Sequence, residues 1–231
     1  SNITWIYLFG TDGEVLVHFK TTMGISGYPV DVTISNNGVM VGVSYLYMEN
    51  GTMTTKVAFY NFGGVGQNEI DHLVSGYNYV DAIVPTLQFM NETTAFAVAD
   101  NRLMFYQDSQ IPTSIGETIL TENVQSIYYS SDYVGLVFLN TDGKSKYRLD
   151  IYSSSGKIVH SQEFDMEYKE ILFEKELFII YNEIECSIYN LDGVEKYSGL
   201  FEKQVSLLIP SSKQTRYLYV TPEEIEIMEL K

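Results

Sequence analysis

The strongest constraint on the fold is a short hairpin pattern that the chain repeats. Its clearest copy spans residues 149–160, where an apolar and an aromatic residue precede three serines, Gly156 and a run that alternates between apolar and polar residues. A glycine at this place supplies the positive φ angle of a tight hairpin turn, so the pattern predicts strand, turn and strand. Similar copies occupy residues 8–15 and 188–195, and weaker copies occupy residues 59–65 and 105–111.

The spacing of the copies predicts the architecture. The aromatic residue of the pattern recurs at Phe9, Tyr60, Tyr106, Tyr152 and Tyr189, at intervals of 51, 46, 46 and 37 residues. Repeats of about 40 to 50 residues are typical of β-propeller blades, each of which is a four-stranded antiparallel sheet. We therefore expect an all-β propeller of about five blades. Because the expected strands do not add up to whole blades, the chain is either a ring with an irregular closing blade or an arc of a larger propeller.

We expect residues 1–231 to form one propeller domain without a helix. The predicted blade units are 1–28 (partial), 29–80, 81–122, 123–166, 167–203 and 204–231 (partial). Two strands are predicted at residues 69–74 and 82–89. Pro85 lies in the second of them, where its missing N–H predicts a bulge or a strand end.

Charge and cysteine content exclude several classes of protein. The chain carries 30 acidic and 14 basic residues, and its formal charge of −16 disfavours binding to nucleic acid or to anionic lipid. A single cysteine, Cys186, rules out an internal disulfide. This thiol shares a strand face with Ile184 and Ile188, which predicts a buried and unreactive group. No segment approaches the roughly 18 consecutive apolar residues of a membrane helix, so we expect these residues to be soluble.

Several segments carry a resemblance to a known family. They are residues 26–38, Val43-Ser44-Tyr45-Leu46, Phe59-Tyr60-Asn61-Phe62-Gly63 and Val65-Gly66-Gln67. In these segments the chain resembles an uncharacterised family of membrane-anchored, propeller-like proteins from clostridial bacteria, and the resemblance extends over nearly the whole chain. It implies an N-terminal transmembrane helix and further blades outside these residues, with the propeller on the outer side of the cytoplasmic membrane. It supplies no catalytic residues.

The repeats are also loosely similar to those of WD40 and quinoprotein propellers. The chain lacks the Gly-His and Trp-Asp pairs of the first group and the tryptophan-rich docking motifs of the second. We therefore predict no quinone and no other cofactor.

Groups that could carry catalysis are few. The three histidines, His18, His72 and His160, are too far apart in sequence to indicate a metal site, and we expect structural roles for them. Neither Ser26 nor Ser44 completes the Gly-x-Ser-x-Gly pattern of an exposed nucleophile. The sequence therefore predicts no catalytic residue.

Carboxylates cluster in two segments, residues 163–170 and 223–229. Neither segment contains the glycine turn of a calcium-binding loop, so we interpret both as solvated acidic faces and predict no metal site. The Asp-Gly pairs at residues 12–13, 142–143 and 192–193 are interpreted as hairpin turns.

Tyrosine is the residue in greatest excess, with 19 copies. Most are expected to pack between blades with the hydroxyl at the rim, but some could form a recognition surface, because tyrosine is enriched at interfaces. The candidate binding residues are Tyr28, Tyr45, Tyr47, Tyr77, Tyr79, Tyr217 and Tyr219.

The leading functional hypothesis is a non-enzymatic, extracytoplasmic scaffold that binds a protein or a small molecule at the cell surface. Its membrane attachment would be an N-terminal anchor outside these residues. The alternative is a hydrolase or carbohydrate-binding domain that uses acidic and tyrosine-rich loops on one propeller face. An intracellular adaptor is a third reading, and it requires that there be no anchor. We also expect open apolar blade faces to favour self-association.

Overall fold

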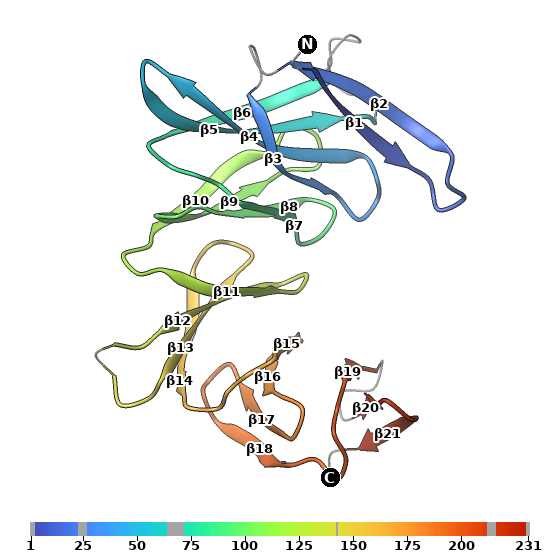
Figure 1. Cartoon of the computed structure of the whole chain (residues 1–231), viewed down its shortest axis with the longest axis vertical. Helices are drawn as coiled ribbons and strands as arrows, with labels where there is room; N and C mark the ends of the chain where they lie inside the picture. Colours follow the sequence, from blue (N-terminus) through green and yellow to red (C-terminus); the bar gives the residue numbers. More distant parts are fainter. Residues whose placement is uncertain (1–2, 23–26, 64–71, 142, 212–215, 230–231) are drawn as a thin grey trace. The chain divides into compact units, whose positions relative to one another are not determined.

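Figure 1 shows the computed structural model, which describes residues 3–22, 27–63, 72–141, 143–211 and 216–229. Within these ranges the chain forms 21 β-strands and no helix, so none of the described segments is a helix that could cross a membrane. The strands make six antiparallel sheets that follow one another along the chain, and four of these sheets have four strands. The predicted all-β class and the repeated four-stranded sheet are confirmed.

Packing divides the chain into two units. The first unit comprises residues 1–123 and 154–156, and the second comprises residues 124–153 and 157–231. A single propeller domain over residues 1–231 stays a prediction.

The first unit contains three sheets. A two-stranded sheet consists of β1 (Ile3–Phe9) and β2 (Val15–Thr22). The next sheet consists of β3 (Tyr28–Ile34), β4 (Met40–Glu49), β5 (Thr52–Asn61) and β6 (Leu73–Val80), in that order. The third consists of β7 (Thr86–Phe89), β8 (Thr94–Val98), β9 (Arg102–Gln107) and β10 (Thr113–Ile119), again in chain order.

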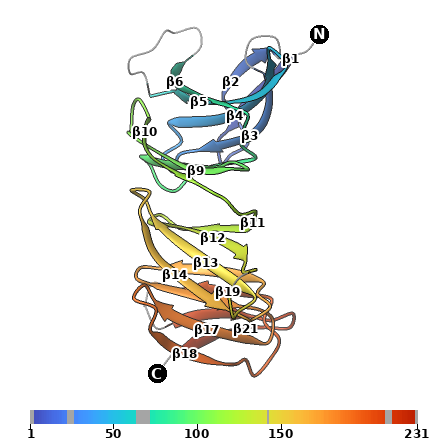
Figure 2. The same cartoon turned by 90° about the vertical axis from the view of Figure 1, so that its left-hand side faces the viewer.

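The second unit also contains three sheets, which Figure 2 shows from another side. The first consists of β11 (Val124–Tyr129), β12 (Tyr133–Leu139), β13 (Tyr147–Ser153) and β14 (Ile158–Phe164). The second consists of β15 (Glu170–Glu174), β16 (Leu177–Tyr181), β17 (Glu185–Asn190) and β18 (Glu195–Leu200). The last has three strands, β19 (Leu207–Pro210), β20 (Arg216–Val220) and β21 (Ile225–Glu229).

The repeated hairpin pattern has one recurring geometry. Its glycines Gly13, Gly156 and Gly193 have φ angles of 83°, 78° and 79°, which a side chain would strain. In the clearest copy the Ser153 N–H donates to the Lys157 carbonyl at 2.8 Å, and the pairing register shifts between Ile151 and Tyr152. The copies at residues 8–15 and 188–195, which contain Gly13 and Gly193, have the same hydrogen bond across the turn and the same shift in pairing register. The extra residue of each bulge lies in the strand after the turn, so the pattern encodes a hairpin with a bulge opposite its aromatic residue.

Two strand predictions need correction. The fourth strand of its sheet is β6, at Leu73–Val80, and not residues 69–74, of which residues 69–71 lie outside the described ranges. The predicted strand at residues 82–89 is shorter, because β7 begins at Thr86, directly after Pro85. The proline marks a strand end, since it has no N–H to contribute to a ladder. Of the predicted Asp-Gly turns, the one at residues 142–143 includes Asp142, which also lies outside these ranges.

One buried cluster of the first unit lies between its two four-stranded sheets. Phe59 is fully buried there, with its ring edge-on to Tyr106 at 5.1 Å and to Phe89 at 6.0 Å between centroids. Polar bonds fix how these sheets face each other, because the Leu87 N–H donates to Asp31 at 2.7 Å and the Phe89 N–H donates to Thr33 at 3.0 Å.

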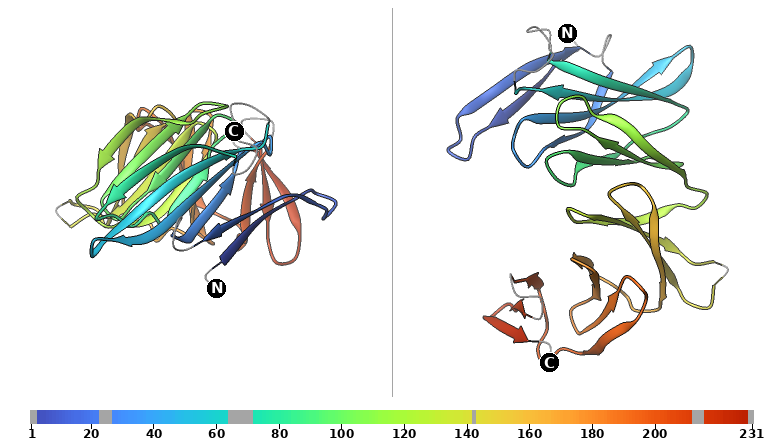
Figure 3. Two further views of the ribbon diagram at one scale, coloured as in Figure 1. Left: turned by 90° about the horizontal axis from the view of Figure 1, so that it is seen from above. Right: turned by 180° about the vertical axis from the view of Figure 1, so that it is seen from behind.

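In the second unit, the three-stranded sheet packs through one face on the β15–β18 sheet, and Figure 3 shows the two sheets in red and orange. The side chains that it contributes to their common core are Leu208, Tyr217 and Tyr219, which meet Ile179, Tyr181 and Ile188. This packing holds the last strand, β21, in place.

We predict that Phe59→Ala lowers the free energy of unfolding by about 3–5 kcal/mol, because it leaves a cavity between two sheets. The matched control is Phe9→Ala, whose ring is 57% exposed, and a change within about 0.5 kcal/mol is expected for it. Urea titration followed by tryptophan and tyrosine fluorescence measures both variants. Equal losses in the two variants would contradict the described core.

Candidate functional site

A cleft in the second unit is the candidate site. It has a volume of about 340 Å³ and lies where β18, the segment after β18, and strands β20 and β21 meet. Its lining residues are Tyr197, Leu200, Phe201, Glu202, Lys203, Tyr219, Glu226 and Ile227. One part of the cleft is therefore aromatic and aliphatic, and the other part is charged.

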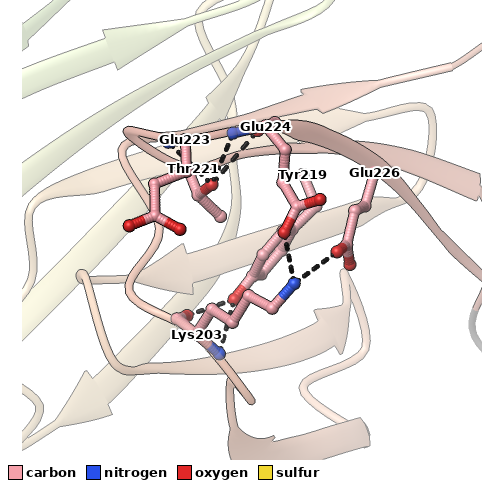
Figure 4. A network of polar contacts seen from close by, with 6 residues as sticks. All are labelled: Lys203, Tyr219, Thr221, Glu223, Glu224 and Glu226. Atoms are coloured by element: carbon pink, nitrogen blue, oxygen red, sulfur yellow. Dashed lines mark hydrogen bonds and ion pairs between the residues drawn. The ribbon is translucent and has the colours of Figure 1, made fainter.

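Lys203 forms the centre of the charged part, as Figure 4 shows. Its Nζ donates to Glu226 Oε1 at 2.6 Å and also to Glu224 Oε1. The hydrogen bonds that Lys203 donates to these two carboxylates raise the pKa of Lys203, and the lysine in turn lowers the pKa of Glu224. In Figure 4 the carboxylate of the adjacent Glu223 points away from the lysine. The charged part thus contains more carboxylates than cations.

Tyr219 fixes the backbone of Lys203. Its hydroxyl accepts a hydrogen bond from the Lys203 N–H at 2.9 Å and donates to the Lys203 carbonyl oxygen. Its ring lies edge-on to Phe201, with 5.5 Å between centroids. The segment is also held at both ends, because the N–H groups of Phe201 and Val205 donate to carbonyls of Ile184 and Glu183. The cleft therefore has a rigid floor.

A turn between β20 and β21 sets the position of the glutamates. The Thr221 Oγ1 accepts hydrogen bonds from the backbone N–H groups of Glu223 at 3.3 Å and Glu224 at 3.0 Å. The Thr221 N–H in turn donates to the Glu224 carbonyl at 2.9 Å. This threonine turn starts β21 so that Glu224 and Glu226, two residues apart, point to the same face.

The apolar part of the cleft is open to solvent. Leu200 at the end of β18 is 73% exposed, Ile227 on β21 is 67% exposed, and Tyr197 is 41% exposed. Large apolar side chains gathered at a cleft that also holds charges are typical of an interaction surface.

The seven candidate tyrosines do not share one location. Three of them, Tyr45, Tyr79 and Tyr217, are buried, and Tyr219 is buried with its hydroxyl at the cleft. The Tyr45 hydroxyl bonds that of Tyr60 at 3.0 Å, and the Tyr79 hydroxyl bonds that of Tyr106 at 2.6 Å. Burial raises the pKa of both Tyr45 and Tyr79. These bonded pairs stabilise the packing of the first unit.

The other candidate tyrosines lie in the first unit. Tyr28 is 58% exposed on β3, in a row with Val30, Val32 and Ile34, while Tyr47 and Tyr77 are partly buried. The Tyr77 hydroxyl donates to the Pro112 carbonyl oxygen at 2.9 Å. A binding role for Tyr28 and self-association through its apolar row stay predictions.

Among the described residues, no group of three or more His, Cys, Asp or Glu side chains is placed to hold a metal ion. His18 stacks on Tyr7 with 5.7 Å between ring centroids, and His160 packs against Phe178 at 5.8 Å. Cys186 is buried, as its sequence pattern predicts, and burial raises the pKa of its thiol to about 11.

Sequence reasoning missed Lys203, Tyr197, Leu200 and Ile227. One signal was available, because residues 224–227 alternate between acidic and aliphatic residues. The two partners of Lys203 lie more than 20 residues away in the sequence, so no local pattern marks the lysine itself.

A family model described as "Family of unknown function (DUF5711)" matches residues 1–230 of the chain. Among curated protein sequences, none matches significantly.

Similar solved structures identify the fold. BamB from Moraxella catarrhalis has a TM-score of 0.53 at 7% identity, covering 94% of this chain and 61% of that one. Sqt1 from Chaetomium thermophilum has a TM-score of 0.56 at 11% identity, covering 90% and 59%. A eukaryotic initiation factor has a TM-score of 0.59 at 11% identity, covering 97% and 58%.

These similar structures are β-propellers, so the predicted propeller of four-stranded antiparallel blades, about five in number, is confirmed. The chain spans about 60% of their length.

Two tyrosines of the three-stranded sheet allow a matched test of the cleft floor. We predict that Tyr219→Phe lowers the free energy of unfolding by about 1–2 kcal/mol, because the Lys203 backbone groups lose their partner. Tyr217→Phe is the control, since its buried hydroxyl forms no well-aligned hydrogen bond among the described residues and burial together with the Glu174 carboxylate raises its pKa, so we expect a smaller loss from it. Urea titration measures the free energy of unfolding of both variants. A larger loss of this free energy in Tyr217→Phe than in Tyr219→Phe would contradict the described hydrogen bonds.

We also predict that the Cys186 thiol reacts very slowly with a disulfide reagent at about pH 8, because it is buried and almost wholly protonated there. In guanidinium chloride the same thiol should react at the rate of a free cysteine. Fast reaction of the folded protein would show that the thiol is accessible.

Proposed function

The chain belongs to the DUF5711 family, and we propose that it is a non-enzymatic propeller scaffold that binds a protein partner at the cleft beside β21. The observation that carries this proposal is the composition of the cleft, which joins exposed Tyr197, Leu200 and Ile227 to Lys203 and its carboxylates. Aromatic and aliphatic side chains supply the area that a protein partner buries, and charges around them select and orient that partner.

A protein fits this cleft better than a small molecule does. Pockets for small molecules enclose about 70–90% of the ligand surface. Here the apolar residues Leu200 and Ile227 are 73% and 67% exposed, so they would cover only one side of a small ligand. A protein surface laid across the cleft would instead bury both side chains together.

The proposal places the scaffold outside the cytoplasmic membrane, at the cell surface. The support for this location is the resemblance of residues 26–38, 43–46, 59–63 and 65–67 to membrane-anchored clostridial proteins. The strongly acidic composition adds support, because a formal charge of −16 disfavours partners such as nucleic acids.

Site-specific photo-crosslinking in cells that make the protein tests the proposal. A photoreactive amino acid at Leu200 is expected to give a discrete protein adduct, and Ile227→Lys should abolish this adduct by placing a charge in the apolar part of the cleft. The matched control position is Ile119, which is 62% exposed on β10. Absence of an adduct at Leu200, or the same adduct from both positions, would contradict a partner at the cleft.

A further inference from the structure

The sequence contains two Asn-Gly pairs, and both lie in hairpin turns of the first unit. Asn37-Gly38 lies between β3 and β4, and Asn50-Gly51 lies between β4 and β5. A glycine has no side chain to shield its backbone nitrogen, so this nitrogen can attack the amide carbon of a preceding asparagine. Both asparagines are exposed. Solvent access therefore does not distinguish the two pairs, but their hydrogen bonds do.

Hydrogen bonds hold both reacting groups of the first pair. The Asn37 Oδ1 accepts from the Ser35 hydroxyl at 2.8 Å and from the Val39 N–H at 3.1 Å. The Gly38 N–H donates to the Ser35 carbonyl oxygen at 2.8 Å. Ser35 is buried, and its Oγ accepts from the Met40 N–H at 2.9 Å. The side-chain amide of Asn37 and the backbone nitrogen of Gly38 are thus fixed by separate bonds.

The second pair has a different turn. Asn50 and Gly51 have φ angles of 51° and 83°, which are typical of a two-residue type I′ turn. This turn joins Glu49 to Thr52, the last residue pair of the β4–β5 ladder, and all four residues are exposed. Within the described part of the chain, no hydrogen bond reaches the Asn50 side chain or the Gly51 N–H. Both reacting groups of this pair are therefore unrestrained.

We propose that Asn50 loses its side-chain amide through a cyclic imide with Gly51, so that the hairpin tip becomes a mixture of aspartate and isoaspartate. In the first step the Gly51 nitrogen gives up its proton and bonds to Asn50 Cγ, the Cγ–Nδ2 bond breaks, and ammonia leaves. Water then opens the imide. Attack at Cγ gives aspartate, and attack at the backbone carbonyl carbon gives isoaspartate, whose main chain runs through Cβ and Cγ. This reaction is independent of the cleft and of the proposed function.

The two turns resist ring closure to different extents, because the glycine nitrogen must turn toward Cγ in each. At Asn50 this movement separates the pair Glu49 and Thr52 at the end of a ladder, where opening costs little free energy. At Asn37 it also breaks the bonds to Oδ1 and the bond from the Gly38 N–H. Each net hydrogen bond that must break slows a reaction by roughly fivefold, so we expect Asn50 to react at least about tenfold faster than Asn37.

The reaction changes the tip of the β4–β5 hairpin. Both products place a new negative charge beside Glu49, and isoaspartate also lengthens the main chain of the turn by a methylene group. A two-residue turn sets the register in which Met48 lies opposite Met53, so the longer turn should loosen this end of the ladder. The buried Tyr45 further along β4 should keep its environment.

Mass spectrometry of the full 231-residue chain, aged in mildly alkaline buffer, tests the inference. Replacement of the amide by a carboxylate raises the mass of a peptide, and fragmentation of that peptide identifies the residue. We expect conversion at Asn50 to be at least about tenfold faster than at Asn37. In guanidinium chloride the two asparagines should react at the same rate, because the bonds of the folded turns are gone. A methyltransferase specific for isoaspartate measures the fraction of that product.

Variants of the protein give a second arm. Ser35→Ala removes the hydroxyl that holds Asn37 and should speed conversion at Asn37 by about fivefold, with the rate at Asn50 unchanged. Asn50→Gln should abolish the fast reaction, because a longer side chain closes its ring more slowly. Circular dichroism and urea titration check that both variants fold.

Three outcomes would overturn the inference. The first is equal conversion of Asn37 and Asn50 in the folded chain. The second is an unchanged Asn50 in the folded chain after a time in which both asparagines convert in guanidinium chloride. The third is an unchanged rate at Asn37 in folded Ser35→Ala, since hydrogen bonds would then not control the reaction.

Discussion

Backbone hydrogen bonding between neighbouring strands is the interaction on which the structure depends. An all-β chain satisfies most of its buried N–H and C=O groups by pairing strands, and the complete sheets do so by placing four strands in chain order. Hairpins closed at Gly13, Gly156 and Gly193 fix which strands meet and shift the register by a bulge. Among the described residues the last sheet has three strands, β19–β21, in which β20 pairs with both of the others.

The side chains around the cleft are held before any partner arrives. Tyr219 bonds both backbone polar groups of Lys203, Thr221 starts β21 by accepting from Glu223 and Glu224, and Lys203 joins the two strand-face glutamates. A surface ion pair contributes little to stability, so Lys203 matters more for the position of the two glutamate side chains than for the stability of the fold. A surface that is already ordered costs less conformational entropy on binding, which favours its use as a docking site.

Most of the fold can be predicted from the sequence, but little of the candidate site can. The turn chemistry of residues 153–157 and its copies predicts the strands and their order, because a positive-φ glycine leaves few other conformations. The start of β7 follows from Pro85. The prediction for β6 ends too early, because Ser75-Gly76, a pair typical of turns, lies inside this strand. The cleft could not be predicted, because its polar contacts join Lys203 to residues more than 20 positions away in the sequence. The burial of Tyr217 could not be predicted either, because no local sequence pattern distinguishes a buried tyrosine from an exposed one.

Amide hydrogen exchange along β21, followed by NMR, tests the central claim most directly. If β21 pairs with β20 alone, those β21 amides that point away from β20 exchange much faster than the amides of β17, which has neighbours on both sides. Protection of all β21 amides in the free chain, equal to that of β17, would show that β21 is paired on both sides and would contradict the account.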